Sequence, residues 1–175
     1  MTFSMSDARP TRGPLRPNVG IALFNRAGLV LIAKRLRDDG PEIILPGFEW
    51  QMPQGGIDPH EDPQPAAMRE LWEETGVRSV TYLAETPDWL SYDFPPYDGP
   101  SHRLANFVGQ RQKWFAFRFI GAESEIDVVS SREGDCDPEF SEWRWERLAR
   151  VPELVVPFRR KIYEQVAEAF APFAG

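Results

Sequence analysis

One stretch of the chain, residues 55–77, constrains the fold more than any other, because a turn-rich loop there leads directly into a glutamate-rich helix. Asp62 is a favourable N-cap residue, Pro63 suits the first helical position, and Gly76 is a favourable C-terminal stop. At about 100° per residue, three carboxylates fall within roughly a 100° sector of this helix, and apolar residues fall on the other side. The pattern predicts an acidic face made of Glu70, Glu73 and Glu74, and an opposite packing face made of Met68, Leu71, Trp72 and Thr75.

Three carboxylates on one helix face repel one another, so without a counter-ion at least one of them would have a raised pKa and hold a proton. A divalent metal ion removes this repulsion, and ligands that are all oxygens favour a hard cation such as Mg²⁺ or Mn²⁺. Mg²⁺ also keeps coordination positions for water and substrate phosphates. The acidic face therefore indicates a metal site suited to phosphate chemistry. The alternative is a solvated helix face with Arg69 in local ion pairs, which the short run Arg-Glu-x-x-Glu-Glu alone would favour.

The spacing of the whole stretch is more specific than the run of glutamates. At usages near 6% each, seven identities at fixed positions coincide by chance on the order of once in 10⁸ starting points. The chain matches every fixed position of the Nudix box, with Gly55, Glu61, Arg69, Glu70, Glu73, Glu74 and Gly76 and the apolar residues Leu71 and Val77. It therefore resembles the Nudix hydrolases, which cleave nucleoside diphosphates linked to another group and use divalent metal ions.

This resemblance implies roles for several residues of the stretch. Glu70, Glu73 and Glu74 would be catalytic and would hold the metal ions, Mg²⁺ or in its place Mn²⁺, together with Gly55. Arg69 would orient the neighbouring carboxylates through charge-assisted hydrogen bonds and would not touch the substrate. A non-hydrolytic nucleotide sensor on the same fold is a less favoured alternative, because a protein that only binds nucleotides has no need of the full set of glutamates.

Two further segments restrict the resemblance to one branch of the family. Residues 50–56 read Trp-Gln-x-Pro-Gln-Gly-Gly, and residues 109–115 read Gly-Gln-x-Gln-Lys-Trp-Phe. Both are similar to the branch of the family that contains RNA 5′-pyrophosphohydrolases and diadenosine tetraphosphate hydrolases, and the similarity extends over about residues 16–170. The resemblance implies removal of pyrophosphate from the 5′-triphosphate end of RNA, with hydrolysis of diadenosine tetraphosphate to ATP and AMP as the alternative.

The same resemblance adds candidate residues outside the box. Glu139, in a Pro-Glu-Phe sequence, would be a metal ligand or a base, whereas its sequence context alone favours an exposed strand end. Phe158 would stack on a substrate base, with core packing as a near-equal alternative. The remaining candidates for substrate binding are Arg35 and Lys113, which would hold phosphates, together with Tyr92 and Arg159.

Composition and charge limit the number of domains and the kinds of binding partner that we expect. With 175 residues, 42% of them hydrophobic, the chain can fill one core but is too short for two ordinary domains, so we expect a disordered tail at residues 1–15 and one domain at residues 16–175. No apolar run reaches the roughly 18 residues that span a bilayer, so we expect a cytoplasmic protein that contacts no membrane. We also expect the protein to be a monomer. The net charge of −7 argues against an extended nucleic-acid tract, so only the end of an RNA would be held. The single cysteine, Cys136, is expected in a loop.

Periodicity places further elements around the glutamate-rich helix. Two apolar runs, residues 19–24 and 29–33, are separated by a turn and predict a hairpin. Strands are also expected at residues 79–85, 89–94, 114–119, 125–129 and 138–145, a helix at residues 157–172, and loops at residues 37–49 and 130–137. Strands from both ends of the chain around one helix, with a second helix at the C-terminus, predict an α/β fold of the Nudix type, an α/β/α sandwich with a mixed sheet.

Overall fold

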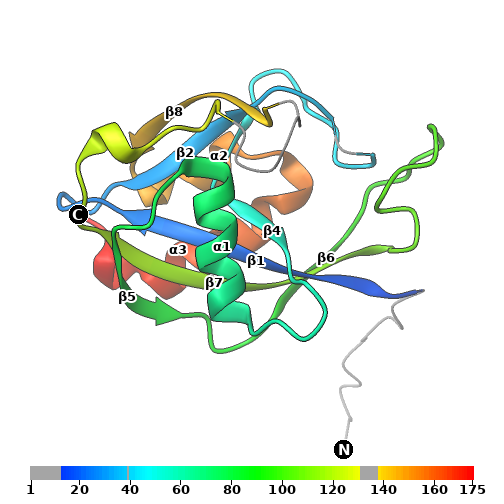
Figure 1. Cartoon of the computed structure of the whole chain (residues 1–175). Helices are drawn as coiled ribbons and strands as arrows, with labels where there is room; N and C mark the ends of the chain where they lie inside the picture. The colour runs from blue at the N-terminus through cyan, green and yellow to red at the C-terminus, as the bar shows by residue number, and fades with distance from the viewer. Residues whose placement is uncertain (1–12, 39, 131–137) are drawn as a thin grey trace, which may run out of the picture.

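The computed structural model describes residues 13–38, 40–130 and 138–175 (Figure 1). The expected tail lies outside the described residues except at its end, where residues 13–15 lead into the first strand. Cys136 and most of the loop expected at residues 130–137 also lie outside them. The description below concerns the rest of the chain.

A mixed sheet of eight strands forms the centre of the molecule. Its hydrogen-bonded path runs β3-β2-β1-β7-β5, with β4 and β6 paired to β1 and β7, and β8 paired to β2. The strands are β1 (Leu15–Phe24), β2 (Val30–Arg35), β3 (Trp50–Gln51), β4 (Gln54–Gly56), β5 (Val80–Glu85), β6 (Leu90–Asp93), β7 (Gly109–Phe119) and β8 (Phe140–Glu146). β1 and β7 are parallel, from Leu15 opposite Gly109 to Phe24 opposite Arg118, and the other strand pairings within the described residues are antiparallel. The predicted mixed sheet is confirmed.

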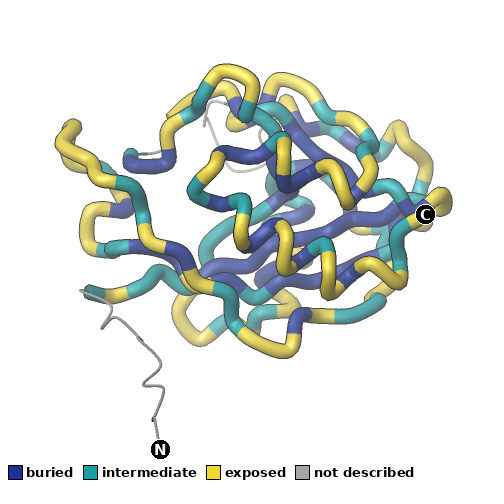
Figure 2. Tube along the Cα trace, turned by 180° about the vertical axis from the view of Figure 1, so that it is seen from behind, coloured by how far each residue is buried: buried dark blue, intermediate teal, exposed yellow. Residues whose placement is uncertain are grey.

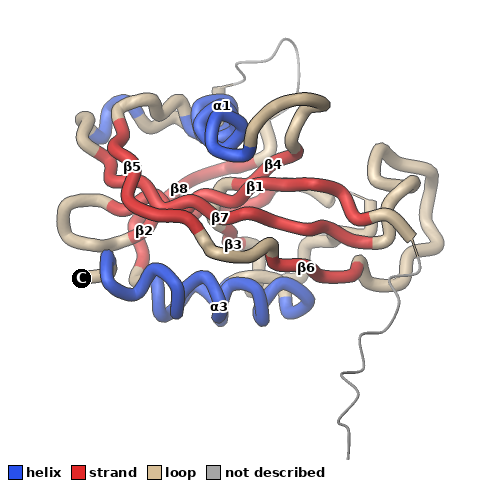
Figure 3. The backbone as a smooth tube through the Cα atoms, turned by 90° about the horizontal axis from the view of Figure 1, so that it is seen from below, coloured by secondary structure: helices blue, strands red, loops and turns tan. Residues whose placement is uncertain are grey.

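Helices cover both faces of this sheet, so the predicted α/β/α sandwich is also confirmed. Figure 3 shows α1 (Pro63–Thr75) on one face and α3 (Arg160–Phe170) on the other. The short helix α2 (Val151–Leu154) and four single 3₁₀ turns complete the helices: Glu123–Glu125, Leu148–Arg150, Pro157–Arg159 and Ala171–Phe173. Successive side chains of β1 point to opposite faces, so Ile21 and Leu23 pack on the α1 side while Ala22 and Phe24 pack on the α3 side. The central strands are therefore buried on both faces (Figure 2).

The predicted hairpin between the first two strands is confirmed. The Asn25 side chain accepts hydrogen bonds from the backbone N–H groups of Ala27 and Leu29, at 3.0 and 2.9 Å, which is the way asparagine commonly closes a turn. Gly28 adopts a positive φ of 79° in this turn. The strands at residues 79–85 and 89–94 are confirmed as β5 and β6, but each pairs with β7 rather than with the other.

The predicted boundaries of the glutamate-rich helix are confirmed as well. α1 begins at Pro63 and ends at Thr75, and Gly76 follows in the left-handed conformation with its N–H bonded to the Trp72 carbonyl. The predicted division of its faces is wrong in part, because Leu71 and Thr75 are buried as expected but Met68 is not. The buried side chains are Ala66, Ala67, Leu71 and Thr75, while Met68 is 44% exposed.

The reason for this error lies in helix geometry. The buried residues of α1 occupy one half of the helix circumference. At 100° per residue, Glu70 and Glu74 point in directions between those of Ala66 and Ala67, so they fall within that same half. Only the small side chains of Ala66 and Ala67 let the helix approach the sheet so closely. One face of α1 therefore both packs on the sheet and presents two carboxylates to β4.

The prediction of a strand at residues 125–129 is also wrong. That segment leaves the 3₁₀ turn Glu123–Glu125 and bonds to the end of α1, with the Asp127 N–H 2.8 Å from the Thr75 carbonyl. Its alternating apolar residues, Ile126 and Val128, are buried against the core without a strand partner. The expected C-terminal helix is present but divided, since 3₁₀ turns flank α3 on both sides.

Candidate active site

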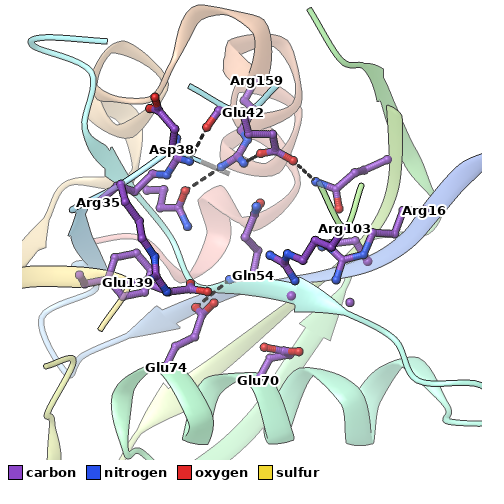
Figure 4. Close-up of a pocket in the computed structure, with 17 residues that line it drawn as sticks. Arg16, Arg35, Asp38, Glu42, Gln54, Glu70, Glu74, Arg103, Glu139 and Arg159 are labelled. Carbon is purple, nitrogen blue, oxygen red and sulfur yellow. Dashed lines mark hydrogen bonds and ion pairs between the residues drawn. The ribbon is translucent and has the colours of Figure 1, made fainter. Parts of the chain in front are cut away.

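A cavity of about 290 Å³ lies where α1, β4, the start of β8 and the loop at residues 36–49 meet. Its helix side is acidic, with Glu70 and Glu74 from α1 and Glu139 from the residue before β8 (Figure 4). The walls also carry five arginines, which are Arg16, Arg35, Arg37, Arg103 and Arg159. Opposite charges therefore line one cavity, which suits a ligand that carries both metal ions and phosphates.

Burial and mutual repulsion perturb the two helix carboxylates. The pKa of Glu70 is raised to about 7, mainly by burial and then by the nearby carboxylates of Glu73 and Glu139, while Arg69 opposes the shift. Burial also raises the pKa of Glu74 well above its ordinary value, with Glu139 and Glu70 as the next causes. The Glu74 and Glu139 carboxyl groups lie next to one another in the cavity (Figure 4). This crowding of carboxylates is the condition that a divalent cation relieves.

Arg69 holds this acidic cluster from the side. Its Nε and Nη2 donate to the two oxygens of Glu61, both at 2.9 Å, in the bidentate geometry that makes arginine–carboxylate pairs strong. Nη1 donates to Glu70 at 3.0 Å and to both oxygens of Glu73 at 3.1 Å, and Nη2 also donates to the Gly56 carbonyl at 2.9 Å. The guanidinium thus ties the loop after β4 to two turns of α1.

Backbone groups of β4 complete the acidic side of the cavity. The Gln54 N–H donates to Glu74 Oε2 at 3.2 Å. At Gly55 a Cβ atom would collide with the Glu70 carboxylate, so only glycine lets the helix carboxylate approach this strand. Gly55 is therefore required here by close approach.

The residues of the cavity fit a hard divalent cation in their chemistry. Glu70, Glu74 and Glu139 supply carboxylate oxygens, two of these groups have raised pKa values, and Gly55 leaves space beside them. Within the described part of the chain, no group of three or more His, Cys, Asp or Glu side chains is positioned as it stands to hold a metal ion. Glu73 does not line the cavity, because Arg69 holds its carboxylate. The metal-ligand and catalytic roles of these residues stay predictions.

The cavity also contains a buried carboxylate that the sequence did not predict, Glu42, which comes from the loop at residues 36–49. Its carboxylate is almost completely buried, forms an ion pair with Arg159, and accepts hydrogen bonds from Gln110 and from the Tyr92 hydroxyl, the latter at 3.1 Å. The Arg35 guanidinium donates to the Glu42 carbonyl at 2.6 Å. The long loop is therefore attached to the wall of the cavity by a buried charge.

The predicted substrate-binding residues are dispersed around this network. Arg35 and Arg159 line the cavity, and both are buried. Tyr92 is also buried, and its ring lies 6.0 Å from that of the half-buried Phe158, which packs at the edge of the core. Lys113 lies away from the cavity lining, with Nζ 3.6 Å from Glu85. The substrate contacts of all five stay predictions, while Arg16 and Arg103 are cavity residues that sequence reasoning did not single out.

The fold and this cavity define the class of protein: an α/β/α hydrolase with an acidic helix that faces arginines across one pocket. The NUDIX domain model matches residues 14–166, and the chain belongs to this family. Within the described residues, every helix is too short or too polar to traverse a bilayer. The cytoplasmic location and the monomeric state stay predictions.

The chain is also similar to individual curated proteins. It is 52% identical over 161 residues to an RNA pyrophosphohydrolase of Azorhizobium caulinodans, covering 92% of this chain and 95% of that protein. It is 51% identical over 161 residues to an RNA pyrophosphohydrolase of Acidiphilium cryptum, covering 92% and 93% of the two chains. Among solved structures, a binary complex of the C. elegans Ap4A hydrolase matches with a TM-score of 0.58 and 17% identity, over 90% of this chain and 99% of that chain. At that identity the structural match shows the fold alone.

Proposed function

We propose that the protein is a metal-dependent RNA pyrophosphohydrolase that removes pyrophosphate from the 5′-triphosphate end of RNA. The observation that carries this proposal is the 52% identity, over 92% of the chain, to a relative named as an RNA pyrophosphohydrolase. The cavity agrees with it, because acidic and basic walls face one another at the scale of a triphosphate. An acidic protein of net charge −7 is suited to hold only the end of a nucleic acid.

In this proposal Glu70, Glu74 and Glu139 would hold Mg²⁺, with Mn²⁺ able to replace it, and Glu73 and Gly55 are further candidate ligands. Bound divalent ions would offset the charge of the phosphates and make water a better nucleophile. Glu74 and Glu139 lie next to one another in the cavity, and divalent ions bound there would favour their ionised forms, so we assign to one of these carboxylates the acceptance of the proton from the attacking water. Arg69 is a positioning residue, since it donates hydrogen bonds to three carboxylates and does not itself line the cavity.

The arginines of the cavity would bind the triphosphate. Arg16 and Arg103 lie together above the acidic helix in Figure 4, whereas Arg35 lies beside Glu139. Guanidinium groups match phosphate oxygens in charge and in bidentate geometry. A phosphate chain held between these arginines and the carboxylate wall would place one phosphorus next to the Glu74–Glu139 pair.

The test is a comparison of two substrates with one enzyme preparation in Mg²⁺. We expect kcat/KM for a short 5′-triphosphate RNA to exceed that for diadenosine tetraphosphate, which presents a similar phosphate chain to the same cavity. A tenfold preference for the dinucleotide, equivalent to about 1.4 kcal/mol in transition-state binding, would overturn the RNA assignment. Binding of either ligand without turnover in Mg²⁺ or Mn²⁺ would instead support a nucleotide sensor.

A further inference from the structure

A second hollow lies outside the catalytic cavity, between the loop at residues 36–49 and the loop that joins β6 to β7. We call it the aromatic groove; its volume is about 580 Å³ and its walls include Pro41, Phe94, Pro95, Tyr97, Pro100 and His102. The β6–β7 loop, drawn in green, extends away from the sheet in Figure 1, and most of its residues are exposed (Figure 2). No role in the proposed reaction has been assigned to this groove.

The rings of the groove are held in place by hydrogen bonds of their own loop. The Tyr97 hydroxyl donates to the Pro100 carbonyl at 2.8 Å, and the Leu104 N–H donates to His102 Nδ1 at 3.0 Å. The Tyr97 and His102 rings meet edge to face, with centroids 4.9 Å apart and an angle of 85° between their planes. Tyr97 is nevertheless 40% exposed. An ordered but open pair of rings is suited to stack on a flat ligand.

The groove and the cavity are lined by neighbouring residues at two places along the chain. Pro41 lines the groove, and Glu42, the next residue, lines the cavity. On the facing loop Arg103 lines the cavity, whereas its neighbours His102 and Leu104 line the groove. The two loops also touch, because a Cβ atom at Gly40 would collide with the His102 ring. An extended ligand that leaves the cavity past Arg103 would therefore enter the aromatic groove.

We propose that the aromatic groove binds the nucleotides of a single-stranded RNA that follow its 5′ end. This inference rests on the proposed function, in which the cavity holds the 5′-triphosphate. Proteins bind single-stranded RNA by stacking its bases on Tyr, His and similar side chains, and such stacking tolerates any base because every base has a π face. Arg103, at the junction, matches the negative phosphate that would link a nucleotide in the cavity to one in the groove.

The occupant is RNA rather than a second small ligand because the residues of the groove are direct neighbours of residues that line the cavity proposed to hold the RNA end. A stacking groove also agrees with the charge of the protein. Long basic tracks are the usual means of holding nucleic acid, and a chain whose 27 acidic residues outnumber its 20 Lys and Arg residues is poorly suited to form one. Two rings and one arginine can hold a few nucleotides without such a track.

The length dependence of RNA hydrolysis tests this inference. We would measure kcat/KM of the full chain in Mg²⁺ with a 5′-triphosphate dinucleotide and a 5′-triphosphate octanucleotide, and with diadenosine tetraphosphate. Stacking on aromatic side chains predicts a preference for the octanucleotide of about tenfold. Tyr97→Ala and His102→Ala should each remove most of this preference, and both should act through KM for the octanucleotide.

Two variants separate stacking from changes in loop shape. Tyr97→Phe keeps the ring but removes the hydrogen bond to Pro100, so it should retain the length preference. Tyr82→Ala removes a tyrosine of similar exposure, 45%, on β5 outside the groove, and should also retain it. Equal kcat/KM for the two RNAs in the unmodified protein, or an unchanged preference in both alanine variants, would overturn the groove assignment. Inactivity on both RNAs would instead overturn the proposed function.

Discussion

The Arg69 guanidinium donates two parallel hydrogen bonds of 2.9 Å to the Glu61 carboxylate, and so joins the loop after β4 to helix α1. This pair raises the pKa of Arg69 and lowers the pKa of Glu61, which means that both groups stay charged at neutral pH. The same guanidinium reaches Glu70 and Glu73. Arg69 therefore fixes the direction of the carboxylates that we propose for metal binding.

Substitution of Arg69 by Lys should lower both stability and Mg²⁺ affinity. Lysine keeps the charge but cannot reproduce the planar fork that contacts Glu61, Glu70, Glu73 and the Gly56 carbonyl. Because Arg69 is partly exposed, we expect a loss of about 1–2 kcal/mol in the free energy of unfolding, measured with urea. The Mg²⁺ concentration for half-maximal activity should rise in parallel. Arg147→Lys, at an exposed position, is the matched control, and an unchanged Mg²⁺ response in the Arg69 variant would contradict its positioning role.

Substitution of Glu74 by Gln should have opposite effects on activity and on stability. Activity in Mg²⁺ should fall by about 10² or more, because a proposed metal ligand and proton acceptor is lost. Without metal the variant should be at least as stable as the unmodified protein at pH 8, because a buried carboxylate with a raised pKa opposes folding when it ionises. Glu153→Gln, on an exposed position of α2, provides the comparison. Activity within a few-fold of normal would remove Glu74 from the mechanism.

The metal-free protein should lose stability as the pH rises from about 4.5 to 7. Burial raises the pKa of Glu70 from 4.5 to about 7, so in this window the folded state binds more protons than the unfolded state, and the free energy of unfolding falls with increasing pH. The raised pKa of Glu74 acts in the same direction. Denaturation in EDTA at several pH values measures the slope. Saturating Mg²⁺ should reduce it, and the Glu70→Gln, Glu74→Gln double variant should lose most of the fall in the free energy of unfolding across this window. An equal slope in the double variant and the unmodified protein would contradict the assignment.

Removal of the Glu42 carboxylate should destabilise the protein through Arg159. Glu42→Ala leaves the buried Arg159 cation without its ion-pair partner, which typically costs about 3–5 kcal/mol. The double variant Glu42→Gln, Arg159→Gln should recover much of that loss, because neither charge is then buried. A double-mutant cycle by urea denaturation measures the coupling. Additive effects of the two substitutions would show that the pair does not act as a unit.

The sequence predicted the parts of the fold that depend on local patterns. Asp62, Pro63 and Gly76 mark the ends of α1, and Asn25 marks the first turn, because caps and turns depend on residues a few positions apart. The segment at residues 125–129 shows the limit of periodicity. Its alternating apolar residues do face the core, but their backbone bonds to the end of α1, a partner that alternation cannot reveal.

In the candidate site, too, local sequence predicted some features, while others depend on parts of the chain that are distant in sequence. Glu70 and Glu74 lie in one cavity as their spacing predicts, but their burial depends on how closely Ala66 and Ala67 let α1 approach the sheet. Glu42 carried no local signal, since a glutamate in a polar loop is usually exposed. Its partners, such as Gln110, are brought to it only by the complete sheet.

The parallel pairing of β1 with β7 has a consequence for how the chain is made. The first strand to leave the ribosome, Leu15–Phe24, can form a hairpin with β2 at once, but its other edge must wait for Gly109–Phe119. Until then α1 has no finished surface on which to bury Leu71, and the open strand edge can pair with other chains. Contacts so distant in sequence slow folding. Nascent chains that stop before residue 119 should therefore depend on chaperones, although they already carry the complete glutamate-rich helix.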